Sequence, residues 1–392
     1  MAISQKMLAF AERSSWIRRM FEEGARLKAE HGPDKVCDFS LGNPDLPPPD
    51  QFRTALQKAA ADNEPGRHSY MPNGGYPFVR AAVARRISRE QEVTVDGQEL
   101  LMTVGAAGGL NVALKALLDP GDEVIILAPF FVEYHFYVDN HGGTAITVNT
   151  REDFSLDVEA VAAAITARTK AVIINSPNNP TGQIYSAEEL ARLAAILDGA
   201  QQTIYLIADE PYRQIVYDNH RVPGIFQAYR HSLVVSSYSK DLSLPGERIG
   251  YIAVHPEIDD KAPLLDAMTL ANRILGFVNA PALMQRVVAE LQGVTVDTAI
   301  YARRRELFCR LLEQAGYEFV PPKGAFYLFP KSPIADDASF VGLLAEQKIL
   351  AVPGRGFGLP GHFRLSFCVA DDVIERSAPG FAAARAAARN IG

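Results

Sequence analysis

Seven short apolar runs, separated by helical stretches, constrain the fold more than any other feature of the sequence. β-branched residues are common in these runs, which fall near residues 101–106, 123–128, 144–149, 170–176, 203–210, 233–239 and 249–255. Strands that are buried on both faces have this composition. Helical segments lie between them at 109–122, 157–165 and 186–200. The alternation predicts an α/β fold with a mostly parallel sheet covered by helices.

The segments on either side of this region have different patterns. Scattered apolar positions in residues 1–31 predict an amphipathic helix that serves as an arm or a docking helix. Four prolines within residues 41–50 predict a loop or a domain crossover. Residues 280–315 predict a long, broken helical connection. The residues after 315 predict a separate α+β unit, with strands near 325–329 and 363–369 and a helix near 338–347.

Length and charge narrow the class of protein. A chain of 392 residues is long enough for two domains. The net charge of -7 argues against a surface that binds nucleic-acid phosphates, and no apolar run is long enough to span a bilayer. Charged residues interrupt the N-terminal segment, which therefore does not read as a signal peptide. We expect a cytoplasmic protein that binds neither nucleic acid nor membrane.

The cysteines indicate neither disulfides nor a metal. Cys37, Cys309 and Cys368 lie far apart and form no CxxC pair. This spacing fits neither a disulfide framework nor a zinc site, so we expect reduced thiols and no metal.

The most specific motif is SSYSKDLSLPGERIGY at 236–251, in which Lys240 follows a Val-rich strand. A lysine held in an ordered framework near another cation can have a lowered pKa, and a neutral amine attacks a carbonyl to form a Schiff base. The neighbouring Ser237, Ser239 and Arg248 would suit a phosphate. Taken alone, a lysine among serines is more often a solvated surface residue.

Two further motifs follow predicted strands. NSPNNPTG at 175–182 has prolines and a glycine that fix a turn, and taken alone such a motif is more often an ordinary tight turn. IADEPYR at 207–213 places Asp209 where ligands bind in parallel α/β sheets, although its acids could instead cap a helix.

Taken together and in this order, Lys240 with Arg248, Asn179 in NNPTG, and Asp209 with Tyr212 resemble the fold-type I, class I/II aminotransferases of the aspartate aminotransferase family. The resemblance covers about residues 39–370. It implies a pyridoxal-phosphate enzyme whose large domain holds a mostly parallel seven-stranded sheet sandwiched by helices, beside a smaller α+β domain. The expected divisions are an N-terminal arm with part of the small domain, the large domain, and the C-terminal small domain, at residues 1–42, 43–285 and 286–392.

The resemblance also implies the catalytic roles. Lys240 would hold pyridoxal 5'-phosphate as a Schiff base and then carry the proton between the substrate Cα and the cofactor. Asp209 would keep the pyridine nitrogen protonated, so that the ring accepts electrons. Asn179 and Tyr212 match the pair that hydrogen-bonds the phenolic oxygen of the cofactor.

The phosphate and ring contacts are implied in the same way. The turn Gly105-Ala106-Ala107-Gly108 before a helix would bind the phosphate with Ser237, Ser239 and Arg248. Tyr70 matches a tyrosine that reaches the phosphate from a second subunit, which implies a homodimer with shared active sites. Phe131, in APFFVEY at 128–134, matches the stacking aromatic residue, and a shift by one to Phe130 stays open. A core phenylalanine is the common alternative.

The expected substrates are an L-amino acid and a 2-oxo acid. Arg364, in HFRLSF, matches the arginine that binds the α-carboxylate, and Gly42 matches the loop that closes over the substrate. A distal carboxylate would need a second cation, for which Arg273 and Arg355 are candidates.

Three alternatives to a ping-pong aminotransferase were weighed. A lyase or decarboxylase would use the same cofactor on the same fold. An amino-acid sensor fused to a transcription regulator would need a helix-turn-helix domain and a basic extension, and the N-terminus has neither. A nucleotide-binding protein would need a phosphate-loop motif, which the glycines at 105–109 do not form.

Overall fold

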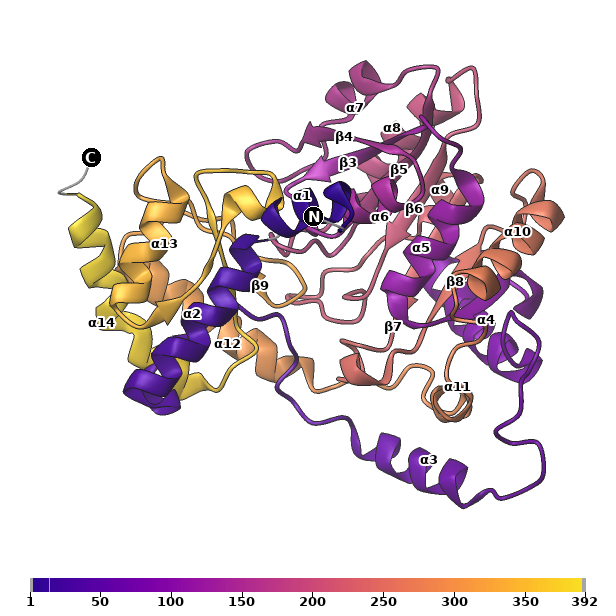
Figure 1. Cartoon of the computed structure of the whole chain (residues 1–392), viewed down its shortest axis with the longest axis horizontal. Coiled ribbons are helices and arrows are strands. Elements are labelled where there is room, and N and C mark those ends of the chain that lie inside the picture. Colours follow the sequence, from indigo (N-terminus) through magenta and orange to yellow (C-terminus); the bar gives the residue numbers. More distant parts are fainter. Residues whose placement is uncertain (1–2, 14, 390–392) are drawn as a thin grey trace.

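The computed structural model describes residues 3–13 and 15–389, and a seven-stranded sheet forms its centre (Figure 1). The strand order is β2-β8-β7-β6-β5-β3-β4, and only β8 runs antiparallel to its two neighbours. The prediction of a mostly parallel sheet is confirmed. Its strands are β2 (Leu100–Thr103), β3 (Glu123–Ala128), β4 (Thr144–Asn149), β5 (Thr169–Asn175), β6 (Tyr205–Asp209), β7 (Ser232–Ser237) and β8 (Gly250–Val254).

Helices cover both faces of this sheet. Successive strand residues point to opposite faces, so Ile125 joins one core cluster and Ile126 the other. The first face packs against α4 (Pro77–Gln91), α7 (Val158–Ala164), α8 (Ala187–Asp198), α9 (Ile225–Ala228) and α11 (Ala282–Ala289). The second packs against α5 (Gly105–Leu117), α6 (Tyr134–Asn140) and α10 (Lys261–Ile274). Helix α3 (Asp50–Ala61) packs on α11.

The C-terminal third forms the smaller α+β domain, on the left in Figure 1. Its core is rich in aromatic rings, including Phe308, Phe340 and Phe381. Three strands pair antiparallel in the order β11-β12-β9, and β1 pairs in parallel with β10. The elements are β1 (Cys37–Asp38), β9 (Tyr327–Leu328), β10 (Ile349–Leu350), β11 (Val352–Pro353), β12 (Phe363–Ser366), α12 (Thr298–Gln314), α13 (Asp337–Glu346) and α14 (Asp371–Ala388).

The N-terminal segment contains two helices, α1 (Gln5–Arg13) and α2 (Ser15–His31), and connects the two domains. Phe10 of α1 packs edge-on against Phe136 of α6, with 4.8 Å between ring centroids. Leu27 of α2 packs with Val36 and Leu350 of the small domain. Residues 1–2 and 14 of the predicted arm lie outside the described residues. The domain boundaries at 42/43 and 285/286 stay a prediction.

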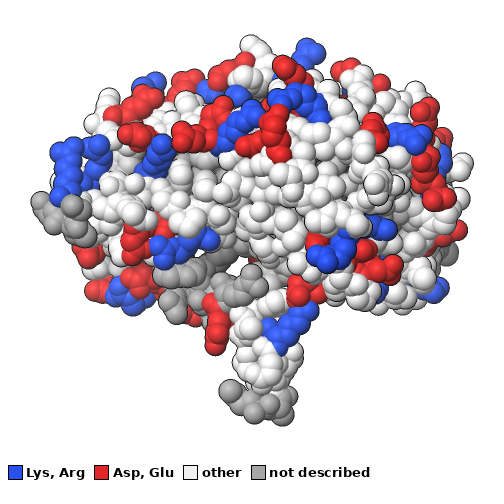
Figure 2. Space-filling model, turned by 90° about the horizontal axis from the view of Figure 1, so that it is seen from above, with Lys and Arg blue, Asp and Glu red and all other residues white. Residues whose placement is uncertain are grey.

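Four short 3-10 helices complete the secondary structure: η1 (Pro33–Lys35), η2 (Gly97–Glu99), η3 (Pro245–Glu247) and η4 (Gly354–Phe357). Among the described residues, no helix has the length and apolar character needed to cross a membrane. On the face seen in Figure 2, basic and acidic side chains alternate along the rim.

Candidate active site

A cavity of about 350 Å³ lies where β6 and β7 end. Ligands of α/β sheets bind at the carboxyl ends of parallel strands, because the loops there diverge and leave a crevice. The cavity gathers most of the residues that the sequence singled out. Those lining it are Gly42, Ala106, Ala107, Phe131, Asn179, Asp209, Tyr212, Ser237, Ser239, Lys240, Arg248 and Arg364.

Lys240 lies in this cavity and is partly buried. Its Nζ donates a hydrogen bond to the carbonyl oxygen of Gly42 at 2.8 Å. The pKa of Lys240 is lowered to about 8, mainly by burial, with smaller lowering effects of Arg364 and Arg248 and an opposing effect of Cys368. An amine with this pKa is neutral far more often at neutral pH than an exposed lysine, so it is a better nucleophile.

Residue 42 has to be glycine because the side chain of Tyr327 lies too close to its backbone. A Cβ atom at this position would lie 1.9 Å from the hydroxyl oxygen of Tyr327. No side chain fits there, so the carbonyl of Gly42 can approach Lys240 only while residue 42 is glycine.

Asp209, the last residue of β6, is buried. Its Oδ2 accepts a hydrogen bond from the hydroxyl of Tyr134 at 2.6 Å. Its Oδ1 is buried and has no hydrogen-bond partner among the described residues. Burial raises the pKa of Asp209 to about 7, against the lowering effect of Tyr134. A buried carboxylate with one open oxygen is suited to a cationic or N–H-bearing ligand.

Arg364, on β12, enters the cavity from the small domain. Its two terminal nitrogens donate to the Oδ1 of Asn179 at 3.0 Å and to the carbonyl oxygen of Ser40 at 2.7 Å. Its Nε is buried and has no partner among the described residues. The guanidinium lies 4.7 Å from the ring centroids of both Tyr327 and Phe357. These contacts fix a planar cation that is suited to a carboxylate.

Tyr212 lines the cavity three residues after the end of β6. Its hydroxyl shares a hydrogen bond of 2.9 Å with the hydroxyl of Tyr327, and either oxygen can donate. Burial raises the pKa of Tyr212 well above its usual range, so its hydroxyl keeps its proton and can donate.

The predicted phosphate site needs one correction. Helix α5 begins at Gly105, not at residue 109, because Ala106 and Ala107 continue into the helix instead of extending a turn. The first-turn amides therefore lie at the cavity. Gly105 has φ +69°, and a Cβ there would lie 2.7 Å from the Nη2 of Arg248. Ser237 donates from its hydroxyl to that of Ser239 at 3.0 Å.

Other predicted residues lie elsewhere. Phe131 lines the cavity, whereas Phe130 packs into the core. Tyr70 does not line the cavity and is 90% exposed in the single chain. Arg273 is exposed on α10. Arg355 forms ion pairs with Asp336 and Asp337 and does not line the cavity.

Sequence reasoning missed several residues of this site. Tyr134, which holds Asp209, ends the motif APFFVEY, and its position three residues after Phe131 was the available signal. Tyr327 lies in an apolar stretch of the small domain and had no distinguishing pattern, whereas Phe357 lies in the glycine-rich segment VPGRGFG at 352–358. Glu133 lines the cavity, and burial raises its pKa.

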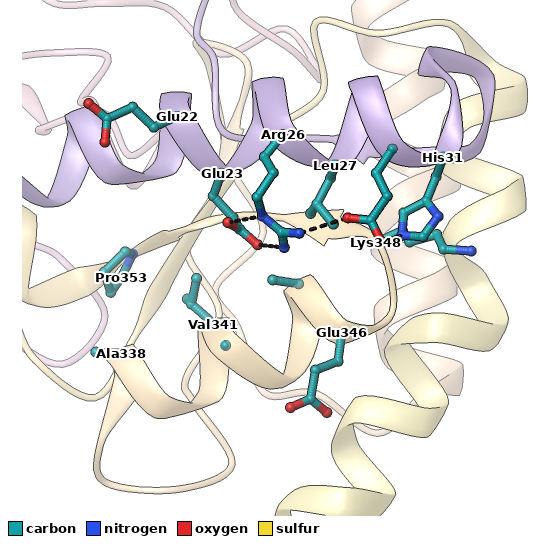
Figure 3. Close-up of a pocket in the computed structure, with 13 residues that line it drawn as sticks. Glu22, Glu23, Arg26, Leu27, His31, Ala338, Val341, Glu346, Lys348 and Pro353 are labelled. Carbon is teal, nitrogen blue, oxygen red and sulfur yellow. Dashed lines mark hydrogen bonds and ion pairs between the residues drawn. The ribbon is translucent and has the colours of Figure 1, made fainter.

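A larger hollow of about 730 Å³ lies between α2 and α13 and contains none of the predicted site residues. Figure 3 shows Arg26 held between two carboxylates on the same helix, Glu23 at 2.6 Å and Glu30 at 2.7 Å. Leu27 of α2 and Val341 of α13 line it as well. We therefore place the active site in the smaller cavity.

Comparison with known proteins shows the family of the chain. The sequence pattern of the family "Aminotransferase class I and II" matches residues 34–378. The chain belongs to the class I and II aminotransferases. It is 36% identical to the aspartate/prephenate aminotransferase of Thermus thermophilus, over 90% of this chain and 91% of that one. It is 34% identical to the aspartate aminotransferase of Geobacillus stearothermophilus, over 90% and 92%.

Solved structures have the same fold. An aminotransferase from Eubacterium rectale has a TM-score of 0.94 and 39% identity, over 97% of this chain and 98% of that one. The Thermus thermophilus aspartate aminotransferase with maleate has a TM-score of 0.85 and 30% identity, over 94% and 96%. The chain is thus a fold-type I enzyme that transfers amino groups with pyridoxal 5'-phosphate.

The residues of the aminotransferase cavity fit this cofactor. The open Oδ1 of Asp209 is suited to the protonated ring nitrogen, and Lys240 offers an amine to the aldehyde. The start of α5 with Ser237, Ser239 and Arg248 offers donors for a phosphate.

Proposed function

We propose that this aminotransferase holds its cofactor covalently through the Nζ of Lys240 and exchanges amino groups between an L-amino acid and a 2-oxo acid by a ping-pong mechanism. One observation carries the proposal. A lysine with a lowered pKa, a buried carboxylate with an open oxygen and a fixed guanidinium line the same cavity.

Each of these residues has a separate task. Arg364 binds the α-carboxylate of the substrate and so orients its Cα. The Nζ of Lys240, as a free amine, would take the proton from the Cα of the substrate and later return one. Asp209 holds the proton on the ring nitrogen through Oδ1, while Tyr134 fixes Oδ2. The cofactor supplies a ring that accepts the electrons left by the Cα proton.

Asn179 and Tyr212 donate to the phenolic oxygen of the cofactor, and Phe131 stacks on its ring. The amides of Gly105, Ala106 and Ala107 bind its phosphate through the N-terminus of α5, a helix of 13 residues. Ser237, Ser239 and Arg248 complete this phosphate site. Gly42 belongs to the segment that closes over the substrate.

The proposed homodimer rests on the exposure of Tyr70. Its ring is 90% exposed in the single chain, which supports a position at the cofactor phosphate of a second copy. We infer a homodimer with shared active sites, working in the cytoplasm, with the domains divided at 1–42, 43–285 and 286–392. Sedimentation would test the dimer. Mixing two inactive variants, Lys240→Ala and Tyr70→Phe, would test the shared active site, because mixed dimers should recover activity.

The substrate side chain is a separate question. Relatives of this chain are named aspartate aminotransferases, and aspartate has a second carboxylate. Among the described residues, the cations that line the cavity are Lys240, Arg248 and Arg364, all with tasks given above. The carboxylate of Glu133 also lines the cavity and adds a negative charge. It has no hydrogen bond or ion pair with the other described residues. We therefore infer that the residues contributed by one chain favour neutral or cationic side chains over dicarboxylic ones.

A half-reaction panel tests the function. The purified enzyme is mixed with single amino acids, and loss of the cofactor absorbance is followed together with the product. Release of a 2-oxo acid supports transamination. Release of carbon dioxide or ammonia would instead favour the lyase or decarboxylase, and a reaction only with aspartate and glutamate would contradict the inferred side-chain preference.

A further inference from the structure

A chain of buried charges lies behind the active site. The carboxylate of Asp241 pairs with Nη2 of Arg86 at 3.0 Å, and Nε of Arg86 pairs with Glu90 at 2.6 Å. Glu90 lies 3.9 Å from Nε of Arg213, which pairs through Nη1 with Glu210 at 2.9 Å. The side chains of these five residues are at most 13% exposed. The five charged groups thus contact one another in a continuous series that is shielded from solvent.

The two ends of this chain adjoin the residues with the central chemical tasks. Asp241 directly follows Lys240, and Glu210 directly follows Asp209. The last two turns of α4 supply Arg86 and Glu90. Gln91 of the same helix donates to Glu210 at 3.2 Å.

The strand pairing of the sheet fixes Asp209 more directly than Lys240. Asp209 belongs to β6 and is paired with Val235 of β7 in the parallel ladder. Strand β7 ends at Ser237, so Lys240 lies in the turn beyond the ladder. Hydrogen bonds within and around the turn hold it, among them one from the amide of Leu244 to the carbonyl of Tyr238 at 3.3 Å. Asp241 ties the turn to more distant segments: its carbonyl accepts from the amide of Val296 at 2.7 Å, and its side chain accepts from Arg86.

Arg86 and Arg213 each hold more than one group. Arg86 also lies 5.7 Å from the ring centroid of Tyr238, two residues before Lys240. Arg213 donates from Nη2 to the carbonyl of Glu90 at 2.6 Å. Removing one member leaves its neighbours charged and buried without a partner, which costs far more than an exposed ion pair contributes. The five charged groups therefore depend on one another for their pairing.

We infer that Arg86 is a positioning residue: through Asp241 and Glu90 it fixes the turn of Lys240 relative to Asp209, and so sets the path of the proton between Lys240 and the substrate Cα. This rests on the proposed function of Lys240. Arg86 touches neither substrate nor cofactor, and a misplacement of about 1 Å in such a path costs up to about 100-fold in rate.

The test compares holoenzymes of Arg86→Lys and the matched control Arg85→Lys, whose side chain is exposed on the same helix. Lysine keeps the charge but cannot bridge Glu90 and Asp241 as the guanidinium does. The half-reaction is followed with the fastest amino acid of the panel, with hydrogen or deuterium at Cα. We expect Arg86→Lys to lower the saturating rate about 10-fold, to leave KM within about 2-fold, and to raise the isotope effect. The control stays at the parental values.

Asp241→Asn is the second variant and breaks the same link from the other end. If Arg86→Lys does not fold, the same changes are expected in Asp241→Asn. Unchanged rates and isotope effects in the folded variants would overturn the inference, as would a change in KM alone. Peptide mapping of the reduced holoenzyme separates the two proposals. Label on Lys240 in every variant keeps the proposed function intact whatever the rates, whereas label on another lysine defeats it.

Discussion

The Nζ of Lys240 donates to the carbonyl oxygen of Gly42 at 2.8 Å, across 198 residues of sequence. A neutral amine that donates one proton in this way keeps its lone pair for an aldehyde carbon. The bond also ties the N-terminal segment to the turn after β7.

The first prediction concerns pH. Because burial lowers the pKa of Lys240 to about 8, the neutral fraction falls about tenfold for each pH unit below it. Mixing cofactor-free protein with pyridoxal 5'-phosphate should give an attachment rate that rises from about pH 6 to 8 and then levels. Stopped-flow absorbance measures this rate. A rate that still rises steeply at about pH 10 would show an ordinary, exposed amine.

The second prediction concerns Asp209. Burial raises its pKa to about 7, so between about pH 4 and 7 the cofactor-free folded chain keeps a proton that the unfolded chain has lost. Stability from this group is therefore present at low pH and is lost as the pH rises. At about pH 8, Asp209→Asn should stabilise the cofactor-free protein by about 1–4 kcal/mol while disabling catalysis.

Urea unfolding of both cofactor-free proteins at about pH 5 and pH 8 checks this expectation. The advantage of Asp209→Asn should shrink at the lower pH. A variant that is less stable at about pH 8, or an advantage independent of pH, would show that Asp209 is ionised at little cost in the folded chain.

The third prediction concerns Arg364. Its replacement by alanine removes the α-carboxylate contact and leaves the Oδ1 of Asn179 without its donor. Loss of one partner of a buried charge pair costs about 2–5 kcal/mol, so kcat/KM for an amino acid should fall at least about 30-fold. A simple alkylamine, which has no carboxylate, should react equally well with both proteins. An equal loss for the amine would assign Arg364 a structural task only. Arg192→Ala, at an exposed position on α8, is the control.

The fourth prediction concerns Glu133. Replacing it with glutamine removes a negative charge from the cavity and should favour dicarboxylic substrates by about 5-fold or more. The measured quantity is kcat/KM for glutamate divided by kcat/KM for alanine, with exposed Glu188→Gln as the matched control. A ratio that does not change in Glu133→Gln would place the carboxylate of Glu133 away from the substrate side chain.

The sequence predicted the large sheet well. The run at 123–128 coincides with β3, which is buried along its whole length and therefore leaves an apolar run. The run at 144–149 coincides with β4, an edge strand that is more exposed and whose apolar residues are interspersed with polar ones. The start of α5 was wrong because the glycines near residue 105 resemble a turn, although the alanines between them favour helix. Helix α4 went unrecognised, because its buried Arg86 and Gln91 interrupt the apolar pattern.

The site was predicted in part for a related reason. Lys240, Asp209 and Asn179 follow strands, and strand ends meet at one edge of a parallel sheet. Tyr134 and Tyr327 make their contacts through the tertiary fold, with partners 75 and 115 residues away, and a local motif does not encode such distances. The same holds for the pairing of Arg86 with Asp241, 155 residues apart.

The attachment of the cofactor to Lys240 is tested most directly by reducing the holoenzyme with borohydride, digesting it and mapping the labelled peptide by mass spectrometry. We expect the pyridoxyl group on Lys240 and no label on exposed Lys115, and no stable label in Lys240→Ala. A pyridoxyl group found on any other lysine of the parental enzyme would contradict the account.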